Sequence, residues 1–255
     1  MPEAAPLTTS SRVYYASGGM ATGIINNGFN SFVLLYYSNV LGLSAAMVGS
    51  ALAIALAFDA VSDPVVGYFS DNLRSRWGRR HPLIYFSIVP VTLLFYLLWN
   101  PPLEASNSTT LFWYLLSVTI PLRLLLTFYD VPSNALVPEL TPDYDERTKL
   151  LNSRWSVYFF SANGITVAMY AYWLRNTPEH PTGLLNIAGY EQMGLVGAAI
   201  VLVTMLASSV GLHRFIPYLR AAPPRQRLAP RAIYREMRTT FADSSLVALL
   251  AAGLF

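Results

Sequence analysis

The chain has 255 residues and no cysteine, which excludes disulfide bonds, thiol catalysis and cysteine metal sites. Hydrophobic residues make up 54% of the sequence and charged residues only 12%, about half of the ~25% usual in soluble domains. The mean hydropathy is +0.40. The net charge is only +3, and we expect no nucleic-acid partner. This composition predicts a protein whose solvent is the lipid bilayer.

Six apolar segments are long enough to cross a bilayer, since a transmembrane helix needs about 20 residues to span ~30 Å of hydrocarbon. We place them near residues 13–40, 44–70, 83–100, 110–137, 152–174 and 188–212. A seventh apolar segment starts at Ser244 and is too short to span before the sequence stops. We therefore predict an all-α membrane protein with a six-helix bundle over 1–212, a basic linker over 213–243 and the truncated start of a seventh helix over 244–255.

Positive charge alternates between the connections. Arginine and lysine residues lie at 74–80, at 147–154 and along 214–238, whereas the loops at 100–110 and 176–186 contain neither. By the positive-inside rule, the N-terminus, the basic loops and the linker are cytoplasmic. We expect an integral protein of the plasma (inner) membrane.

The first predicted helix is unusually polar. The stretch GGMATGIINNGFN places Asn26 and Asn30 four residues apart, on one helix face. Two roles stay open for these amides, packing between helices or the lining of a polar cavity, and in the second role we predict that Asn26 and Asn30 bind substrate. Gly23 in the same stretch allows close contact with a neighbouring helix.

Acidic side chains interrupt the second and fourth predicted helices. Asp59 and Asp63 share a helix face, and Arg123 precedes Asp130 by seven residues, nearly two turns. Each acid facing lipid at mid-membrane costs ~2.5–3.5 kcal/mol, so these groups are expected to face a polar interior.

One arginine cannot neutralise three carboxylates, so a proton or a bound cation must compensate the rest. Oxygen-rich pockets suit hard cations. We therefore predict a cation or proton site at Asp59, Asp63 and Asp130, in which Asp59 and Asp63 are the metal ligands if the coupling ion is Na⁺. The alternative is structural, with ion pairs that only orient helices. In the fifth predicted helix, Trp155 follows Arg154, a pair that can stack on a sugar ring and donate to its hydroxyls.

Two blocks, DAVSDPVVGYFSDNLRSRWGRRHP and YDVPSNALVPELTPDYDERTKLLNSR, closely resemble motifs of the glycoside–pentoside–hexuronide:cation symporters. This family is a branch of the major facilitator superfamily that includes the melibiose permease. The resemblance extends from Tyr14 to about Leu212. It implies a fold of two six-helix bundles, of which this chain is the N-terminal one, so that the C-terminal bundle is a missing partner.

The resemblance also implies roles for single residues. Asp59 and Asp63 match a cation-coordinating pair, Asp130 an acid of the sugar and cation site, and Arg154 an arginine that binds sugar hydroxyls. A cytoplasmic gate loop is matched by Gly67, Asp71, Arg76, Gly78 and Arg79. In that loop, Gly67 is expected to let helices approach, Gly78 to permit a tight turn, and the charged residues to form pairs that break on opening.

Three positions depart from the melibiose permease. That permease has an aspartate where this chain has Gly23, a tryptophan where it has Asn134, and an arginine where it has Leu56. Melibiose is therefore not the expected substrate. We hypothesise that Arg123 supplies the positive charge that is missing at Leu56.

These features favour a secondary active transporter that couples uptake of a sugar or glycoside to Na⁺ or H⁺ by alternating access, with no other cofactor. Its partners would be a small polar solute and the bilayer. The alternatives are transport of a lysolipid or another non-sugar solute, and an inactive inserted fragment. An enzyme is not expected, because His81, His180 and His213 lack the spacing of a metal site and no nucleophile motif occurs.

Overall fold

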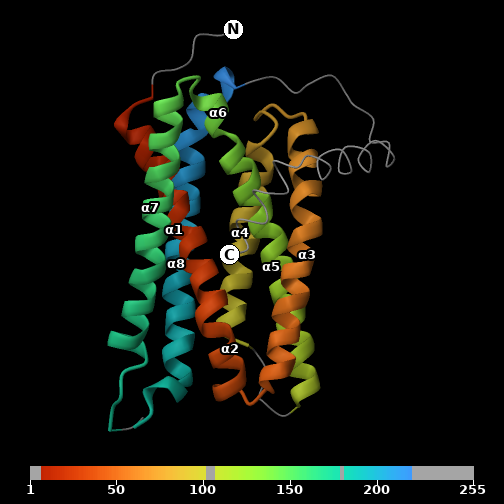
Figure 1. The fold of residues 1–255 in the computed structure, drawn as a ribbon, viewed down its shortest axis with the longest axis vertical. Coiled ribbons are helices and arrows are strands. Elements are labelled where there is room, and N and C mark those ends of the chain that lie inside the picture. Colours follow the sequence, from red (N-terminus) through yellow and green to blue (C-terminus); the bar gives the residue numbers. More distant parts are fainter. Residues whose placement is uncertain (1–6, 102–106, 179–180, 220–255) are drawn as a thin grey trace, which may run out of the picture. The chain divides into compact units, whose positions relative to one another are not determined.

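The computed structural model describes residues 7–101, 107–178 and 181–219, and every regular element in these ranges is a helix (Figure 1). The elements in chain order are α1 (Thr9–Asn27), η1 (Gly28–Phe32), α2 (Val33–Leu35), η2 (Tyr36–Val40), α3 (Ala45–Asn72), α4 (His81–Trp99), α5 (Ser108–Ala135), α6 (Val137–Leu140), α7 (Tyr144–Ala168), η3 (Met169–Trp173), η4 (Gly183–Leu185), α8 (Ile187–Leu212) and η5 (His213–Tyr218). The predicted all-α class is confirmed. Residues 220–243 of the predicted linker and the predicted seventh helix, 244–255, lie outside the described residues.

Side-chain oxygens mark the starts of four long helices. Thr8, Ser44, Asn107 and Asp143 accept backbone N–H bonds at the first turns of α1, α3, α5 and α7. Such caps satisfy N–H groups that the helix itself leaves free. At α4, Pro82 occupies the first turn, where its missing N–H group costs nothing. Local sequence therefore defines where most helices begin.

Within the described residues, four helical stretches are long and apolar enough to cross a membrane. They are Ala45–Asn72, His81–Trp99, Ser108–Leu140 and Ile187–Tyr218, with mean hydropathies of 1.8, 1.9, 1.7 and 2.3. The first and fifth predicted spans form the long helices α1 and α7 but do not meet this criterion. These two helices carry the polar side chains that the sequence singles out, among them Asn26 and Arg154. The polar helices are therefore expected to line a site rather than to face lipid all round.

Figure 1 shows the long helices running alongside one another through the part of the chain from 7 to 219. Helix α1 packs against α7 and α8, while α3 and α4 both pack against α5. Contact between α4 and α8 joins these two groups. Side-chain hydrogen bonds also join α5 to α1 and to α7. The predicted cation-binding acids and the predicted pocket residues Asn26, Arg154 and Trp155 lie on these three helices and on α3.

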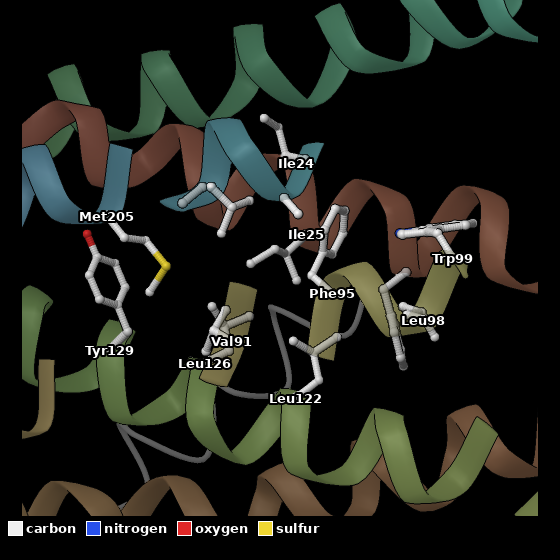
Figure 2. Close-up of a cluster of buried hydrophobic side chains, with 14 of the residues drawn as sticks. Ile24, Ile25, Val91, Phe95, Leu98, Trp99, Leu122, Leu126, Tyr129 and Met205 are labelled. Atoms are coloured by element: carbon white, nitrogen blue, oxygen red, sulfur yellow. The ribbon is translucent and has the colours of Figure 1, made fainter. Parts of the chain in front are cut away.

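Large side chains from several helices fill the centre of the bundle (Figure 2). Ile25 from α1, Phe95 from α4 and Leu122 from α5 are at most 1% exposed. Further along, the Tyr36 ring stacks on Tyr190 at 4.6 Å between ring centroids, and its hydroxyl donates to the backbone of α4. This packing fixes α1 against α4, α5 and α8, so the polar face of α1 has a defined orientation.

Glycines allow α1 and α7 to pack backbone to backbone. A Cβ added at Gly23 would lie 2.5 Å from the Tyr158 carbonyl oxygen and 2.5 Å from Ser161 Oγ. A Cβ at Gly19 would collide with the carbonyl group of Arg154. The close helix contact predicted at Gly23 is therefore present, and the structure has no space there for the acid found in the melibiose permease.

We predict that Gly23→Ala destabilises the bundle. The added methyl group must push α7 away, and such overpacking costs typically ~1–3 kcal/mol. Since 1 kcal/mol shifts the melting temperature of a domain of this size by about 2–4 °C, the expected fall is several degrees. The measurement is thermal unfolding of the detergent-solubilised protein.

Gly164→Ala in α7 is the matched control. A Cβ at this position meets nothing within 4 Å, and alanine is the better helix former by about 1 kcal/mol. The control is expected to unfold at the same or a higher temperature. Equal melting temperatures for the wild type and Gly23→Ala would contradict the packing argument.

Candidate functional site

The first charged group in the bundle is the Arg123 cluster, formed by Asn26, Asp59 and Arg123 from α1, α3 and α5. Arg123 Nε donates to Asp59 Oδ2 at 2.7 Å, and Arg123 Nη2 donates to the same oxygen. Arg123 Nη1 donates to Asn26 Oδ1 at 2.9 Å. The two charged side chains are only 17% and 12% exposed. Burial between three helices gives each charge a partner and avoids the cost of an unpaired ion.

Asp63 lies apart from this cluster, although it shares a face of α3 with Asp59. Its Oδ1 accepts a hydrogen bond from Thr127 Oγ1 at 2.9 Å, and the residue is exposed. In the described part of the chain, no three acidic or histidine side chains gather as a metal centre would require. The role of Asp59, Asp63 and Asp130 as a cation site stays a prediction, and Asp59 and Asp63 have different partners.

The second charged group is the Arg154 cluster, formed by Asp130, Ser133 and Arg154. Arg154 Nη2 donates to Asp130 Oδ1 at 2.7 Å, and Nη1 donates to Ser133 Oγ at 2.6 Å. The guanidinium also lies over the rings of Tyr15 and Tyr129, at 5.1 and 5.9 Å. Arg154 is 5% exposed, whereas the Asp130 side chain is 40% exposed. The arginine is thus fixed in position, while the carboxylate remains accessible to a ligand.

A pocket of about 90 Å³ opens beside the Arg154 cluster, between α1, α5 and α7. Its lining residues are Thr22, Asn26, Asp130, Asn134, Arg154, Trp155 and Tyr158. The structure therefore brings together Asn26, Asp130, Arg154 and Trp155, four of the five predicted substrate-binding residues. Asn30, the fifth, is exposed and does not line this pocket.

Thr22 and Tyr158 were not singled out by sequence reasoning, although the spacing was available. Thr22 precedes Asn26 by four residues in α1, and Tyr158 follows Arg154 by four residues in α7. Residues four apart lie on the same helix face. Once one residue of each helix is assigned to the pocket, its neighbour one turn away is expected there too.

Asn26 connects the two charged groups. Its Oδ1 accepts from Arg123, and the residue also lines the pocket beside Arg154. A ligand that hydrogen-bonds Asn26 therefore acts on the Arg123 cluster through a single side chain. The pocket consequently has a direct physical link to Asp59.

A third charged group, the loop network, lies where α3 ends and α4 begins. It is made by Asp71, Arg79, Arg80 and Glu139. Arg80 binds Asp71 at 3.1 Å and Glu139 at 2.9 Å, and Arg79 forms ion pairs with the same two acids. Burial lowers the pKa of the Arg80 guanidinium, an effect that the Glu139 carboxylate opposes. Arginine stays charged even so, because its ordinary pKa lies far above neutral pH.

Glu139, on α6, was missed as a site residue by sequence reasoning. Its side chain is 3% exposed, the most buried acid of the loop network. Its only signal in the sequence was its place inside the second motif block. There it follows Leu136 by three residues and lies between two prolines, in a segment without helical periodicity.

The remaining gate-loop predictions have mixed outcomes. Gly78 has φ of +77°, a left-handed conformation that favours glycine, as the predicted tight turn requires. Arg76 is exposed and its guanidinium lies over the Trp77 ring at 5.3 Å, outside the loop network. A Cβ at Gly67 would meet only the Val131 side chain at 3.7 Å, an ordinary contact. Close helix approach at Gly67 is therefore not a requirement of this conformation.

Comparison with known proteins gives the chain a family context. It matches the family described as MFS/sugar transport protein over residues 14–255. An uncharacterized symporter of Synechocystis is 30% identical over 87% of this chain and 40% of its own length. The inner membrane symporter YicJ of Escherichia coli is 29% identical over 62% of the chain and 34% of its own length. The sodium-dependent lysophosphatidylcholine symporter 1-A of Danio rerio is 30% identical over 68% and 32%, respectively.

The chain thus spans 40%, 34% and 32% of the length of these three relatives. Its motif blocks lie inside the matched region of the family.

We predict that Glu139→Gln loosens the loop network. The change removes a buried acid and, among the residues that the structure describes, leaves Arg79 and Arg80 with Asp71 as their only acid partner, which is half exposed. Removing one partner of a buried ion pair typically costs ~3–5 kcal/mol. The expected result is faster trypsin cleavage after these arginines, measured on the purified protein.

Glu146→Gln provides the comparison, because Glu146 pairs with Arg12 and Lys149 near the surface. Ion pairs at the surface contribute little, so cleavage in the loop is expected to stay at the wild-type rate. Identical cleavage rates for Glu139→Gln and Glu146→Gln would show that the loop network does not hold the loop.

Proposed function

Because the chain belongs to the MFS/sugar transport protein family, a family of cation symporters and not of enzymes, we propose that its protein carries a glycoside across the membrane together with a cation. The location we propose is the plasma (inner) membrane, as in the name of the relative YicJ, with the N-terminus in the cytoplasm. Transport would proceed by alternating access, so no covalent chemistry is required.

The observation that carries this proposal is the pocket beside Arg154. Arg154 supplies fixed N–H donors, Asp130 a half-open carboxylate, and Asn26 an amide. The Trp155 side chain is 63% exposed at the rim, where its ring can cover the apolar face of a sugar. Paired donors and acceptors beside one aromatic face match the chemistry of a polyhydroxylated ring.

The size of the pocket supports only part of a binding site. Sites for small molecules typically measure ~300–1,000 Å³, whereas this pocket has about 90 Å³. We propose that a second helical bundle supplies the opposite wall. Asp130, Asn134 and Trp155 are open on that side, because each lines the pocket and is at least partly exposed.

The loop network has a different proposed role from that of a breaking gate. Asp71, Arg79, Arg80 and Glu139 pair within one bundle, between the end of α3, the loop and α6. Four charges paired inside one bundle favour a fixed surface. We propose that this surface meets a second bundle when the cytoplasmic side closes.

A lysolipid is the second candidate solute. The relative from Danio rerio is named a lysophosphatidylcholine symporter. In addition, this chain has Gly23 where the melibiose permease has an aspartate. Phe159 and Phe160, one turn beyond Trp155 on α7, are 61% and 73% exposed and apolar. An acyl chain would contact such a face, while Arg154 would bind a phosphate group.

We predict that Arg154→Ala and Arg154→Lys both impair solute binding. Hydrogen bonds from a charged group are worth ~1.5–3 kcal/mol, so loss of the fixed guanidinium should weaken affinity about tenfold or more. The measurement is uptake of radiolabelled glycosides into proteoliposomes that contain the longest product of the gene, under an imposed Na⁺ or proton gradient. Lys149→Ala, an exposed change on the same helix, should leave uptake unchanged.

The same preparation separates the two candidate solutes. Uptake of glycosides that Arg154→Lys abolishes supports the sugar proposal. Uptake of lysophosphatidylcholine in the absence of any glycoside uptake would replace the sugar with the lipid. Transport of neither class by a folded protein would overturn the proposed function.

A further inference from the structure

The Arg123 guanidinium occupies the space where a cation bound to Asp59 would lie. Two of its nitrogens donate to Asp59 Oδ2 and the third to Asn26 Oδ1. Its central carbon, Arg123 Cζ, also lies over the Phe29 ring, 5.1 Å from the ring centroid. Every nitrogen of this guanidinium is therefore bonded, and contacts from α1, α3 and α5 hold it in place.

A fixed guanidinium changes what Asp59 can bind. Arg123 is permanently charged and neutralises the Asp59 carboxylate. A Na⁺ ion at the same carboxylate would lie beside a like charge in a place shielded from water, where repulsion is strong. Sodium also needs several oxygen ligands at once. The residues around Asp59 do not fit a bound metal ion while Arg123 is in place.

Asp63 does not restore such a site. Its partner is the Thr127 hydroxyl, and no cluster of three acidic or histidine side chains occurs among the residues the structure describes. Asp59 Oδ1, by contrast, is buried and accepts no hydrogen bond from the residues that the structure describes. Removal of Arg123 would thus leave the buried Asp59 carboxylate with two unpaired oxygens. The space that the guanidinium vacates would lie beside this carboxylate and the side-chain oxygen Asn26 Oδ1.

We propose that Arg123 is a built-in cation that takes the place of Na⁺ at Asp59, and that it makes this bundle insensitive to sodium. Arg123 is then a specificity-determining residue for the coupling ion. Only the consequence for the coupling ion rests on the proposed function, because the ion pair between Arg123 and Asp59 is a property of the bundle itself. Other ions would have to act elsewhere, with Asp63 as the remaining open carboxylate of α3.

The test measures sodium binding directly, without any solute. The purified chain is unfolded by heat in NaCl and in choline chloride of equal ionic strength, and binding of radioactive ²²Na⁺ is measured in parallel. For the wild type we expect equal melting temperatures and no saturable ²²Na⁺ binding. For Arg123→Ala we expect saturable ²²Na⁺ binding and, at Na⁺ about tenfold above the dissociation constant, a rise in melting temperature of about 3 °C or more.

Two further variants assign the gained site to Asp59. The double change Asp59→Asn with Arg123→Ala removes the carboxylate and should abolish the gained sodium binding. Leu56→Arg combined with Arg123→Ala returns a guanidinium from one turn before Asp59 on α3, and should restore sodium insensitivity. Leu56 is 50% exposed, so an arginine has space there.

Arg123→Gln serves where Arg123→Ala fails to fold, since glutamine removes the charge but keeps a polar side chain with an N–H donor. Saturable Na⁺ binding by the wild type would overturn the proposal. So would the absence of sodium binding in a folded Arg123→Ala or Arg123→Gln variant. Failure of glycoside uptake would count against the proposed function alone, because these measurements contain no solute.

Discussion

The high cost of an unpaired charge in the membrane is the constraint on which this structure depends. Each charged side chain that faces hydrocarbon costs ~2.5–3.5 kcal/mol or more, and the bundle avoids this by pairing across helices. Arg123 joins α5 to α3 and α1, and Arg154 joins α7 to α5. Helix α5 contributes to both pairs. The four helices with polar faces are thus held together by charge, while the more apolar α4 and α8 complete the core.

The fold can be predicted from the sequence because it follows from hydropathy, segment length and charged loops. In the part of the chain that the structure describes, those signals locate all six long helices, and four of these helices also meet the criterion of length and apolar composition. The weaker signals belong to α1 and α7, whose polar residues lower their hydropathy. The same polar residues that weaken the hydropathy signal, such as Asn26 in α1 and Arg154 in α7, line the pocket. In these two helices, the residues that line the candidate site are also the residues that make the helix harder to predict.

The partners of each charge cannot be predicted from the sequence. Arg123 and Asp130 are seven residues apart and share a face, which suggests a common environment. Seven residues also extend about 10 Å along the helix axis, so each side chain meets a different neighbouring helix. Arg123 reaches Asp59 and Asp130 reaches Arg154. Periodicity within one helix predicts the face on which a side chain lies, but not which helix packs against that face. That information depends on packing contacts such as the one at Gly23.

The exposed polar groups of this bundle require a cover that is not lipid. Asp63, Asn134 and Asn163 are exposed on α3, α5 and α7, and Asp130 remains 40% accessible in its side chain. A carboxylate such as Asp63 facing hydrocarbon costs ~2.5–3.5 kcal/mol or more, which its single hydrogen bond from Thr127, worth ~1.5–3 kcal/mol, does not fully offset. Water or a polar protein surface must therefore face these residues. The proposed pathway between two bundles would meet that requirement, because it would wet the polar side of the helices while their apolar sides stay in lipid.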